Sequence, residues 1–403
     1  MNAMRINLFS PEYQEDPYYF YQVMHRHQPL FFHEPTGSYV LSRHEDIVKA
    51  FKDPAFSSRN YAWQMEPLHG KTIIQMDGRE HSASRNVVVP AFRGKELMEN
   101  TLPVMRSYAA ALLSGFNGRE VVELRDEFTN IFPIKVIVGL LGLPEEDLLL
   151  FHRWYNILQR QFTNLSNDDA VLQEALTARD EFRAYLDAVL AERMAKPGHD
   201  LLSVLCTAEV DGVRMDSTQI KGFCGLLLQA GAETTDKALA NMVRNLLLHP
   251  DQFERLRKDR SLLDRAIIES LRFSPPTHML LRVTNEKVQV SGGEIPAEAT
   301  VVCLIGAANR DGKVFDRPDE FNIFREELDP RTAFTGASNI ATFGFGRHYC
   351  VGVQLAKMEM QVAMEYLMDY MEEMSFAEPE IPKEIGVFTR YPESLRIRFK
   401  PRT

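Results

Sequence analysis

The sequence predicts a mainly α-helical fold with small β-sheets, which is an α+β architecture. Residues 100–195 carry apolar residues at three- and four-residue steps over most of their length. A second helical pattern extends from about residue 216 to 248, and at about 1.5 Å per residue it would be roughly 50 Å long, enough to cross a domain. The alternating patterns typical of strands are short and lie outside these two regions.

The composition is that of an ordinary folded protein. The 403 residues are 45% hydrophobic and 25% charged, without a linker or a repeat, so we expect a single domain over residues 1–403. The formal net charge of −10 argues against a general affinity for nucleic acid. No signal-peptide core is present, and no apolar run approaches the ~20 residues of a membrane span. We therefore expect a cytoplasmic protein without a membrane anchor.

The first part of the chain predicts short elements and one irregular stretch. Residues 11–30 are predicted to form one amphipathic helix, and residues 46–51 a shorter one. The patterns at 30–32 and 38–41 flank a turn and predict a β-hairpin. Periodicity fades from residue 56 to 74, which is typical of a packed surface loop or of a mobile loop over an apolar pocket.

One cysteine lies in a glycine-rich loop directly before a helical pattern. Residues 343–352 are Phe-Gly-Phe-Gly-Arg-His-Tyr-Cys-Val-Gly, and apolar residues follow at helical steps. A helix N-terminus favours the thiolate of a nearby cysteine, here Cys350. Glycines permit close approach by a flat ligand, and they are Gly344, Gly346 and Gly352. An inert buried cysteine in a turn is the alternative. The other cysteines form no CxxC pair, so neither a disulfide framework nor a zinc cluster is predicted.

Three further patterns carry polar chemistry. Ala230-Gly231-Ala232-Glu233-Thr234-Thr235 places poor helix formers at the centre of the long helix, where Gly231 clears space beside the backbone. Glu269 and Arg272 lie three apart on one helical turn and can pair, although most such pairs are surface contacts. His81 and Arg85 lie four apart on one face and suit a carboxylate, although a solvated face explains them equally well.

These motifs resemble those of the cytochrome P-450 superfamily in its soluble bacterial type. The fixed positions of its haem-binding loop are filled by Phe343, Gly346, His348, Cys350 and Gly352. In that family the cysteine thiolate is the axial ligand of haem iron. The resemblance extends from about residue 11 to the C-terminus. It implies the cytochrome P-450 fold, with heme b (iron protoporphyrin IX) between the long central helix and the cysteine loop.

The resemblance also implies roles for single residues. Gly231 would lie in the oxygen-binding groove, where Glu233 and Thr234 would deliver protons. The residues that would bind the haem propionates are His81, Arg85, Arg282 and His348. A structural knot beside the haem loop would consist of Glu269, Arg272 and Arg325. The residues that would contact substrate are Trp63, Met65, Ile73, Gln229, Met279, Leu280 and Phe388.

The implied reaction is monooxygenation of a largely apolar small molecule with dioxygen, in secondary metabolism. The chain carries no flavin-binding domain and no iron–sulfur cysteine set, so a separate ferredoxin or flavodoxin with its reductase is implied. The patch of this chain at which that partner would dock would contain Arg79, Arg93, Lys95, Arg347 and Lys357. The alternative is that these residues are a solvated surface. A monomer is expected. The alternatives are a haem-thiolate peroxygenase or isomerase, against which the Glu233–Thr234 pair argues, and a non-enzymatic haem sensor.

The substrate itself stays open at the level of sequence. Residues 80–83 and 386–390 are similar to bacterial enzymes that oxidise cyclic dipeptides, while a terpenoid, a polyketide or a fatty acid is equally compatible. Two departures from the family pattern stand out. Residues 326–340 hold extra polar residues and are predicted as an insertion on the donor-docking face. Gln229 is polar where apolar residues are usual, so it either contacts substrate or faces solvent.

Overall fold

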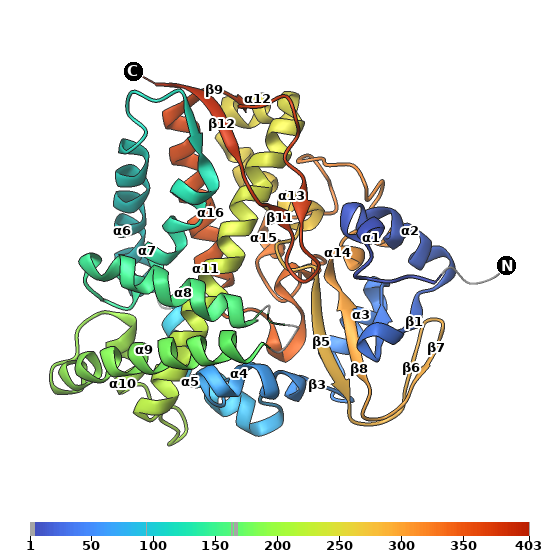
Figure 1. The fold of residues 1–403 in the computed structure, drawn as a ribbon, viewed down its shortest axis with the longest axis horizontal. Helices are drawn as coiled ribbons and strands as arrows, with labels where there is room; N and C mark the ends of the chain where they lie inside the picture. Colours follow the sequence, from blue (N-terminus) through green and yellow to red (C-terminus); the bar gives the residue numbers. More distant parts are fainter. Residues whose placement is uncertain (1–4, 94, 163, 165–167, 403) are drawn as a thin grey trace.

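A computed structural model describes residues 5–93, 95–162, 164 and 168–402 (Figure 1). Its axis is the 32-residue helix α11 (Ser217–Leu248), which is buried over most of its length. Asp216 starts this helix with a capping box, because its carboxylate accepts from the Gln219 N–H at 2.8 Å while the Gln219 side chain accepts from the Asp216 N–H. The predicted helix over about 216–248 is confirmed.

Helices surround α11 and form the larger part of the molecule (Figure 1). Those that contact α11 are α4 (Ala62–His69), α7 (Ile131–Leu140), α8 (Leu148–Phe162), α9 (Asp169–Ala195), α10 (Leu201–Thr207), α12 (Pro250–Lys258), α13 (Leu263–Phe273) and α16 (Val353–Tyr370). Helices α5 (Gly78–Arg93) and α6 (Lys95–Ser114) complete this part and pack against each other and against α16. The main hydrophobic core lies among these helices.

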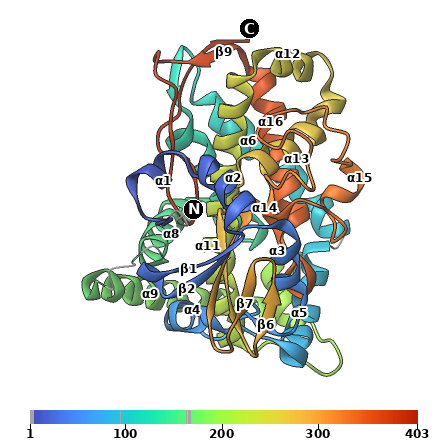
Figure 2. The same cartoon turned by 90° about the vertical axis from the view of Figure 1, so that its right-hand side faces the viewer.

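A five-stranded sheet lies beside the helical part, and Figure 2 turns this side towards the viewer. In spatial order its strands are β1 (Leu30–His33), β2 (Ser38–Leu41), β8 (Thr300–Leu304), β5 (Met279–Thr284) and β3 (Phe56–Ser57). Only the β2–β8 pair is parallel. The short helices on this side are α1 (Pro11–Glu15), α2 (Pro17–His27), α3 (His44–Lys52) and α14 (Ile305–Ala308).

Three smaller sheets complete the fold. A three-stranded sheet has the order β4 (Val121–Glu123), β12 (Arg396–Pro401) and β9 (Met371–Phe376). The two hairpins are β6 (Val288–Val290) with β7 (Gly293–Ile295), and β10 (Glu384–Ile385) with β11 (Tyr391–Pro392). A mainly α fold with small sheets is thereby confirmed, whereas the single domain stays a prediction. None of the described helices combines the length and apolar character that crossing a bilayer requires.

Two stretches differ from the sequence prediction. Residues 11–30 form two helices rather than one, because the Asp16 side chain accepts from the N–H groups of Tyr18 and Tyr19 and Pro17 starts the second helix. Residues 56–74 contain helix α4 despite their weak periodicity and an internal Pro67. Tertiary packing against α9 and α11 therefore outweighs local preference in α4.

A buried ion pair on α13 fixes the crossing of several chain segments. Arg272 donates through Nε and Nη2 to the two carboxylate oxygens of Glu269 at 2.7 and 2.8 Å, and both side chains are 0% exposed. Arg325 joins them, since its Nε donates to Glu269 Oε1 at 3.4 Å. Further N–H groups of both guanidinium groups donate to backbone carbonyls of residues 309 and 316–320. The structure thus brings the three predicted knot residues together.

Asn309 connects this knot to the cysteine loop. Its backbone carbonyl accepts from Arg272 at 2.9 Å. Its side-chain oxygen accepts from the Ala341 N–H at 2.7 Å, and its amide group donates to Thr342 Oγ1 at 2.9 Å. Ala341 and Thr342 begin the loop that contains Cys350. The position of that loop therefore depends on the Glu269–Arg272 pair.

We predict that Glu269→Ala or Arg272→Ala lowers the free energy of unfolding by about 3–5 kcal/mol, because each leaves a buried charge without its partner. Urea unfolding of the purified variants measures the effect. The matched control is Arg260→Ala, since Arg260 pairs with Asp369 at 2.9 Å at the surface and should cost less than about 1 kcal/mol. Equal losses in the knot variants and the control would contradict the prediction.

Candidate functional site

The cysteine loop is built from two 3₁₀ turns, Ala341–Phe343 and Gly346–His348. The Cys350 N–H donates to the Phe343 carbonyl at 2.9 Å and closes the loop on itself. Gly346 has φ +67°, and a Cβ there would lie 2.8 Å from the Phe51 carbonyl of α3. Gly352 caps α16, and a Cβ there would meet nothing within 4 Å. The loop thus requires one glycine for packing and keeps open space beside another.

The protonation of Cys350 differs from the sequence expectation. Burial raises the pKa of its thiol, while a hydrogen bond from the backbone at Gly352 and the charge of Arg85 act in the opposite direction. The helix N-terminus therefore assists the thiolate as expected, but desolvation outweighs it in the protein chain alone. A cation bound to the sulfur would reverse this balance, because metals bind cysteine as the thiolate.

The centre of α11 presents an accessible stretch inside the molecule. Ala230 is exposed and Thr234 is half-buried, whereas Gln229, Ala232 and Thr235 are buried. The Thr234 hydroxyl donates to the Ala230 carbonyl at 2.9 Å. One side of this turn is thus open to a neighbouring molecule.

Gly231 contributes to this turn in an unexpected direction. A Cβ on Gly231 would lie 3.0 Å from Ile137 Cδ1 of α7, so the glycine makes room for that helix. Ala230 is the exposed residue, and sequence reasoning did not single it out. Its spacing of four residues from Thr234, one helical turn, is the signal that could have identified it.

His81 and Arg85 extend from α5 towards the cysteine loop. Arg85 donates to the Tyr349 carbonyl. His81 is buried, and neither of its ring nitrogens has a hydrogen-bond partner among the described residues. Burial, together with the nearby charges of His348 and Arg85, lowers the pKa of His81 to about 4. An open hollow of about 350 Å³ lies here, lined by His81, Ser82, Arg85, Asn86, Gly336, Gly346, Arg347 and Tyr349.

The other two residues predicted to bind propionates lie nearby. The His348 ring packs 4.2 Å from the His81 ring, and its Nε2 lies 3.2 Å from Ser58 Oγ and 3.5 Å from Asp77 Oδ1. Although burial raises it, hydrogen bonds from His348 and Ser57 hold the pKa of Asp77 at about 2. Arg282 of β5 is buried, with its guanidinium 4.3 Å from the centre of the Phe51 ring. Two imidazole rings and two guanidinium groups therefore lie beside the loop.

These observations fit a flat group that carries a metal and carboxylates. Gly352 leaves space beside the cysteine, and Ala230 presents an accessible surface on α11. The unpaired nitrogens of His81 suit a carboxylate ligand. Thr235 Oγ1 donates to Glu359 Oε2 of α16 at 3.2 Å, so the α11 turn and the helix after Cys350 adjoin. Haem has the shape and groups that this donor set accommodates.

Glu233 is held in an ion pair that the sequence analysis did not foresee. Lys237, one turn further along α11, donates from Nζ to Glu233 Oε1, and both side chains are 6% exposed. Lys237 also donates to Thr389 Oγ1 at 2.7 Å. The carboxylate is thus tied to the segment between β10 and β11, in addition to its place beside Thr234.

Gln229 is neither exposed nor unpartnered. Its Oε1 lies 2.8 Å from His69 Nε2 of α4, and it is 3% exposed, so the alternative of a solvent-facing side chain is wrong. Burial lowers the pKa of His69 to about 4, which keeps the ring neutral. Gly225 allows this contact, because a Cβ there would lie 2.8 Å from the His69 ring. Gln229 thereby fastens α4 to α11.

The other predicted substrate residues have different surroundings. Trp63 is 62% exposed, while Met65 is buried. Met279 is buried in the apolar cluster of the N-terminal helices, where Phe388 packs at its edge. Leu280 packs against the neighbouring cluster around Phe51.

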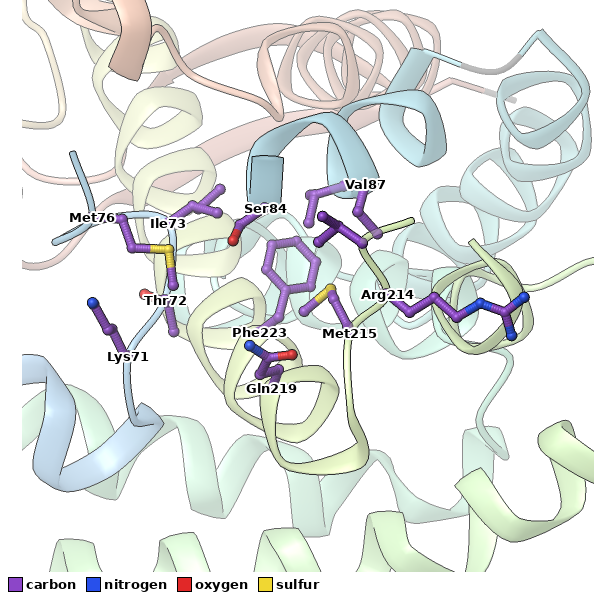
Figure 3. A pocket seen from close by; sticks show the side chains of 12 residues that line it. Lys71, Thr72, Ile73, Met76, Ser84, Val87, Arg214, Met215, Gln219 and Phe223 are labelled. Atoms are coloured by element: carbon purple, nitrogen blue, oxygen red, sulfur yellow. The ribbon is translucent and has the colours of Figure 1, made fainter. Parts of the chain in front are cut away.

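Ile73 lines a small pocket of about 30 Å³ between α5 and the start of α11 (Figure 3). The other residues that line it are Lys71, Thr72, Met76, Ser84, Val87, Val88, Val213, Arg214, Met215, Gln219 and Phe223. Figure 3 shows the Phe223 and Met215 side chains between the two helices. Lys71 pairs with Glu80 and Arg214 pairs with Glu209, so neither cation is free to bind a ligand in this pocket.

The predicted docking patch is only partly described. Arg79 is exposed, whereas Arg347 lies near Asp77 and Lys357 pairs with Asp264 at 2.8 Å. The side chains of Arg93 and Lys95 lie outside the described part of the chain. Residues 326–340 include the short helix α15 (Pro330–Ala333) and contribute to the core through Phe334, whose ring lies 6.0 Å from Phe343.

Comparisons with known proteins agree on one family. The family model described as Cytochrome P450 matches residues 145–384. The chain is 34% identical to "Pulcherriminic acid synthase" of Bacillus subtilis (strain 168), over 98% of this chain and 97% of that protein. Among solved structures, cytochrome P450 CYP109Q5 from Chondromyces apiculatus superimposes with a TM-score of 0.88 at 29% identity, over 98% of each chain. CYP109E1 from Bacillus megaterium in complex with corticosterone gives 0.86 at 28% identity, over 96% and 99%.

We predict that Gly346→Ala lowers the free energy of unfolding by about 2 kcal/mol or more, because an alanine is strained at φ +67° and its Cβ would meet the Phe51 carbonyl. Chemical unfolding measures the loss. Gly336→Ala is the control in the same region, since a Cβ there has free space and no positive φ, and it should change stability by less than about 0.5 kcal/mol. Indistinguishable variants would show that the loop tolerates a different conformation.

Proposed function

The chain belongs to the cytochrome P450 family, and from that premise we propose which of its residues carry out the family's reaction. The family binds haem, receives electrons from a redox partner and oxidises organic molecules, and this chain is a monooxygenase. One observation carries our assignment of the site. The accessible turn of α11 adjoins α16, the helix that begins directly after the Cys350 loop.

Haem, when bound, activates dioxygen and transfers one oxygen atom to the substrate. We assign Cys350 as its ligand through Sγ, within the loop that Phe343, Gly346, His348 and Gly352 shape. Burial raises the pKa of the Cys350 thiol, so Sγ would release its proton on binding a metal. The Glu269–Arg272–Arg325 knot positions this loop through Asn309.

Four side chains would bind the carboxylates of the cofactor, which we take to be heme b. His81 supports this role with two ring nitrogens that lack hydrogen-bond partners in the described chain. Arg85 and Arg282 supply positive charge. His348 Nε2 is already engaged, 3.2 Å from Ser58 Oγ and 3.5 Å from Asp77 Oδ1, so His348 would orient the group through at most one further contact.

Thr234 would hold the proton donor in the groove. Its hydroxyl donates to the Ala230 carbonyl, so its oxygen can accept a hydrogen bond from an ordered water above the accessible turn. Glu233, the next residue, would supply protons to that water. Gly231 and Ala230 keep the turn close to α7 and open on its other side.

The substrate would be a largely apolar small molecule of secondary metabolism. We propose contacts from Met65, Ile73, Met279, Leu280 and Phe388, whereas Gln229 acts by fixing α4 and Trp63 is 62% exposed. Electrons would come from a separate ferredoxin or flavodoxin with its reductase. We further propose a monomer of one domain in the cytoplasm. Spectral shifts of the ferric protein with cyclic dipeptides, terpenoids, polyketides and fatty acids test the substrate class.

We predict that Cys350→Ser removes the strongly red-shifted absorption band of the ferrous carbon monoxide complex, because serine provides no thiolate. The absorption spectrum of the reduced protein under carbon monoxide measures this. Cys303→Ser, at a buried cysteine of β8, is the control and should keep the band. A Cys350→Ser variant that retains the band would rule out Cys350 as the ligand.

We predict that Thr234→Ala keeps haem and substrate binding but loses product per electron by about tenfold or more, because proton delivery becomes poorly directed. Product, electron donor consumed and hydrogen peroxide released are counted together. Thr234→Ser preserves the hydroxyl and serves as the control, with coupling close to that of the unmodified enzyme. Unchanged coupling in Thr234→Ala would remove this residue from oxygen activation.

A further inference from the structure

Lys237 is a buried cation in the central part of helix α11. Its side chain is 6% exposed, and it forms the single ion pair of Glu233 within the described chain. Burial lowers the pKa of Lys237, while the Glu233 carboxylate raises it. A buried ammonium group costs several kcal/mol unless it is paired, so its position at the centre of α11 requires an explanation.

The charged neighbours of this pair have other partners. Asp236 accepts from Thr129 Oγ1 at 2.6 Å and lies 3.5 Å from Arg125 Nη2. The Lys237 ammonium lies 4.5 Å from the centre of the Tyr391 ring, which adds a cation–π contact. Glu233 is therefore the carboxylate with which Lys237 forms its ion pair.

The pair has one further contact, and it comes from another segment. Thr389 accepts from Lys237 Nζ at 2.7 Å, and its hydroxyl lies 3.4 Å from Glu233 Oε1. Thr389 follows Phe388, whose carbonyl accepts from the His278 N–H at 2.7 Å. Thr277 and Thr389 also form an isolated β-bridge. The segment 386–391 thus links the start of β5 to the middle of α11.

We propose that Lys237 is a positioning residue for oxygen activation, which fixes the Glu233 carboxylate beside Thr234 and couples it, through Thr389, to the segment that carries Phe388. This inference rests on the proposed function, since it assigns a reason for the position of the proton-supplying acid. Contact of the substrate with Phe388 would then influence the same carboxylate that serves the groove. Lys237 would act through the side chains that it contacts, Glu233 and Thr389.

The ion pair gives Glu233 properties that a neutral neighbour could not supply. With Lys237 in place, the buried carboxylate keeps one orientation, because the ammonium group donates to its Oε1. Without the ammonium, the carboxyl group loses the hydrogen-bond donor that holds it in place. The helix itself would keep its shape, because Lys237 contributes no capping contact to α11.

Two replacements of Lys237 separate charge from packing. Lys237→Met keeps most of the aliphatic stem and removes the charge, whereas Lys237→Arg keeps the charge and changes the shape. We expect Lys237→Met to reduce product per electron by about tenfold or more, with peroxide released instead, and Lys237→Arg to restore much of the coupling. A role in packing alone predicts the opposite order, so equal or better coupling in Lys237→Met than in Lys237→Arg would overturn the proposal.

Lys221→Met is the matched control on the same helix. Lys221 lies near the start of α11, far along the helix from Glu233, and pairs with the exposed Asp187 of α9. The Lys221→Met variant should leave coupling unchanged. If Lys237→Met does not fold, Lys237→Gln removes the charge, keeps a polar side chain beside an unchanged Glu233 and permits the same measurement. Coupling in Lys237→Gln equal to that of the unmodified enzyme would also overturn the proposal.

A measurement independent of turnover tests the link to residues 386–391. Hydrogen–deuterium exchange of this segment should rise in Lys237→Met and in Thr389→Val, and stay unchanged in Lys221→Met. Unchanged exchange in both variants would disprove the coupling to the segment. This arm remains informative if the carbon monoxide spectrum shows that Cys350 is not the haem ligand, so failure of the proposed function and failure of this inference are distinguishable.

Discussion

The buried Glu269–Arg272 pair is the constraint on which the rest of the site depends. Two desolvated charges would be costly alone, yet each oxygen and N–H group finds a partner: the carboxylate binds two guanidinium groups, and these bind backbone carbonyls of residues 309 and 316–320. Breaking the pair would therefore release several loops together. Since Asn309 joins this network to Ala341 and Thr342, the ion pair on α13 helps to fix the position of the cysteine loop.

The same principle governs helix α11, which carries many polar residues through the core. Gln229 pairs with His69, Asp236 with Thr129 and Arg125, and Thr235 with Glu359. Each contact joins α11 to a different element, so polar groups specify how α4, the π-helical turn Arg125–Thr129 and α16 pack around it. Thr234 is the exception, because it lies with Ala230 on the accessible side of the turn.

Local patterns predicted the long helix, the hairpin at 30–41 and the Glu269–Arg272 pair, because each depends on spacing within a few residues. Arg325, which lies 56 residues from Glu269, was predicted only from the family resemblance. Helix α4 was missed, since its stability comes from packing against α9 and α11. The partner of Gln229 could not be predicted, because His69 lies 160 residues away in the chain. The Glu233–Lys237 pair was different: its i,i+4 spacing was visible in the sequence, but its burial was not. Burial also decided the pKa of Cys350, against the local effect of the helix N-terminus.

Helical geometry explains why one helix can serve both the groove and the segment 386–391. Successive residues on an α-helix point about 100° apart, so Glu233 and Thr234 face different neighbours although they are adjacent. Lys237 lies one turn after Glu233 and shares its face, which is where Thr389 and Tyr391 pack. The backbone between them is rigid, because its hydrogen bonds are internal to the helix. Under the proposed coupling, a displacement of the segment 386–391 would act on the Glu233 side chain rather than on the helix, while the Thr234 hydroxyl would keep its hydrogen bond to the Ala230 carbonyl.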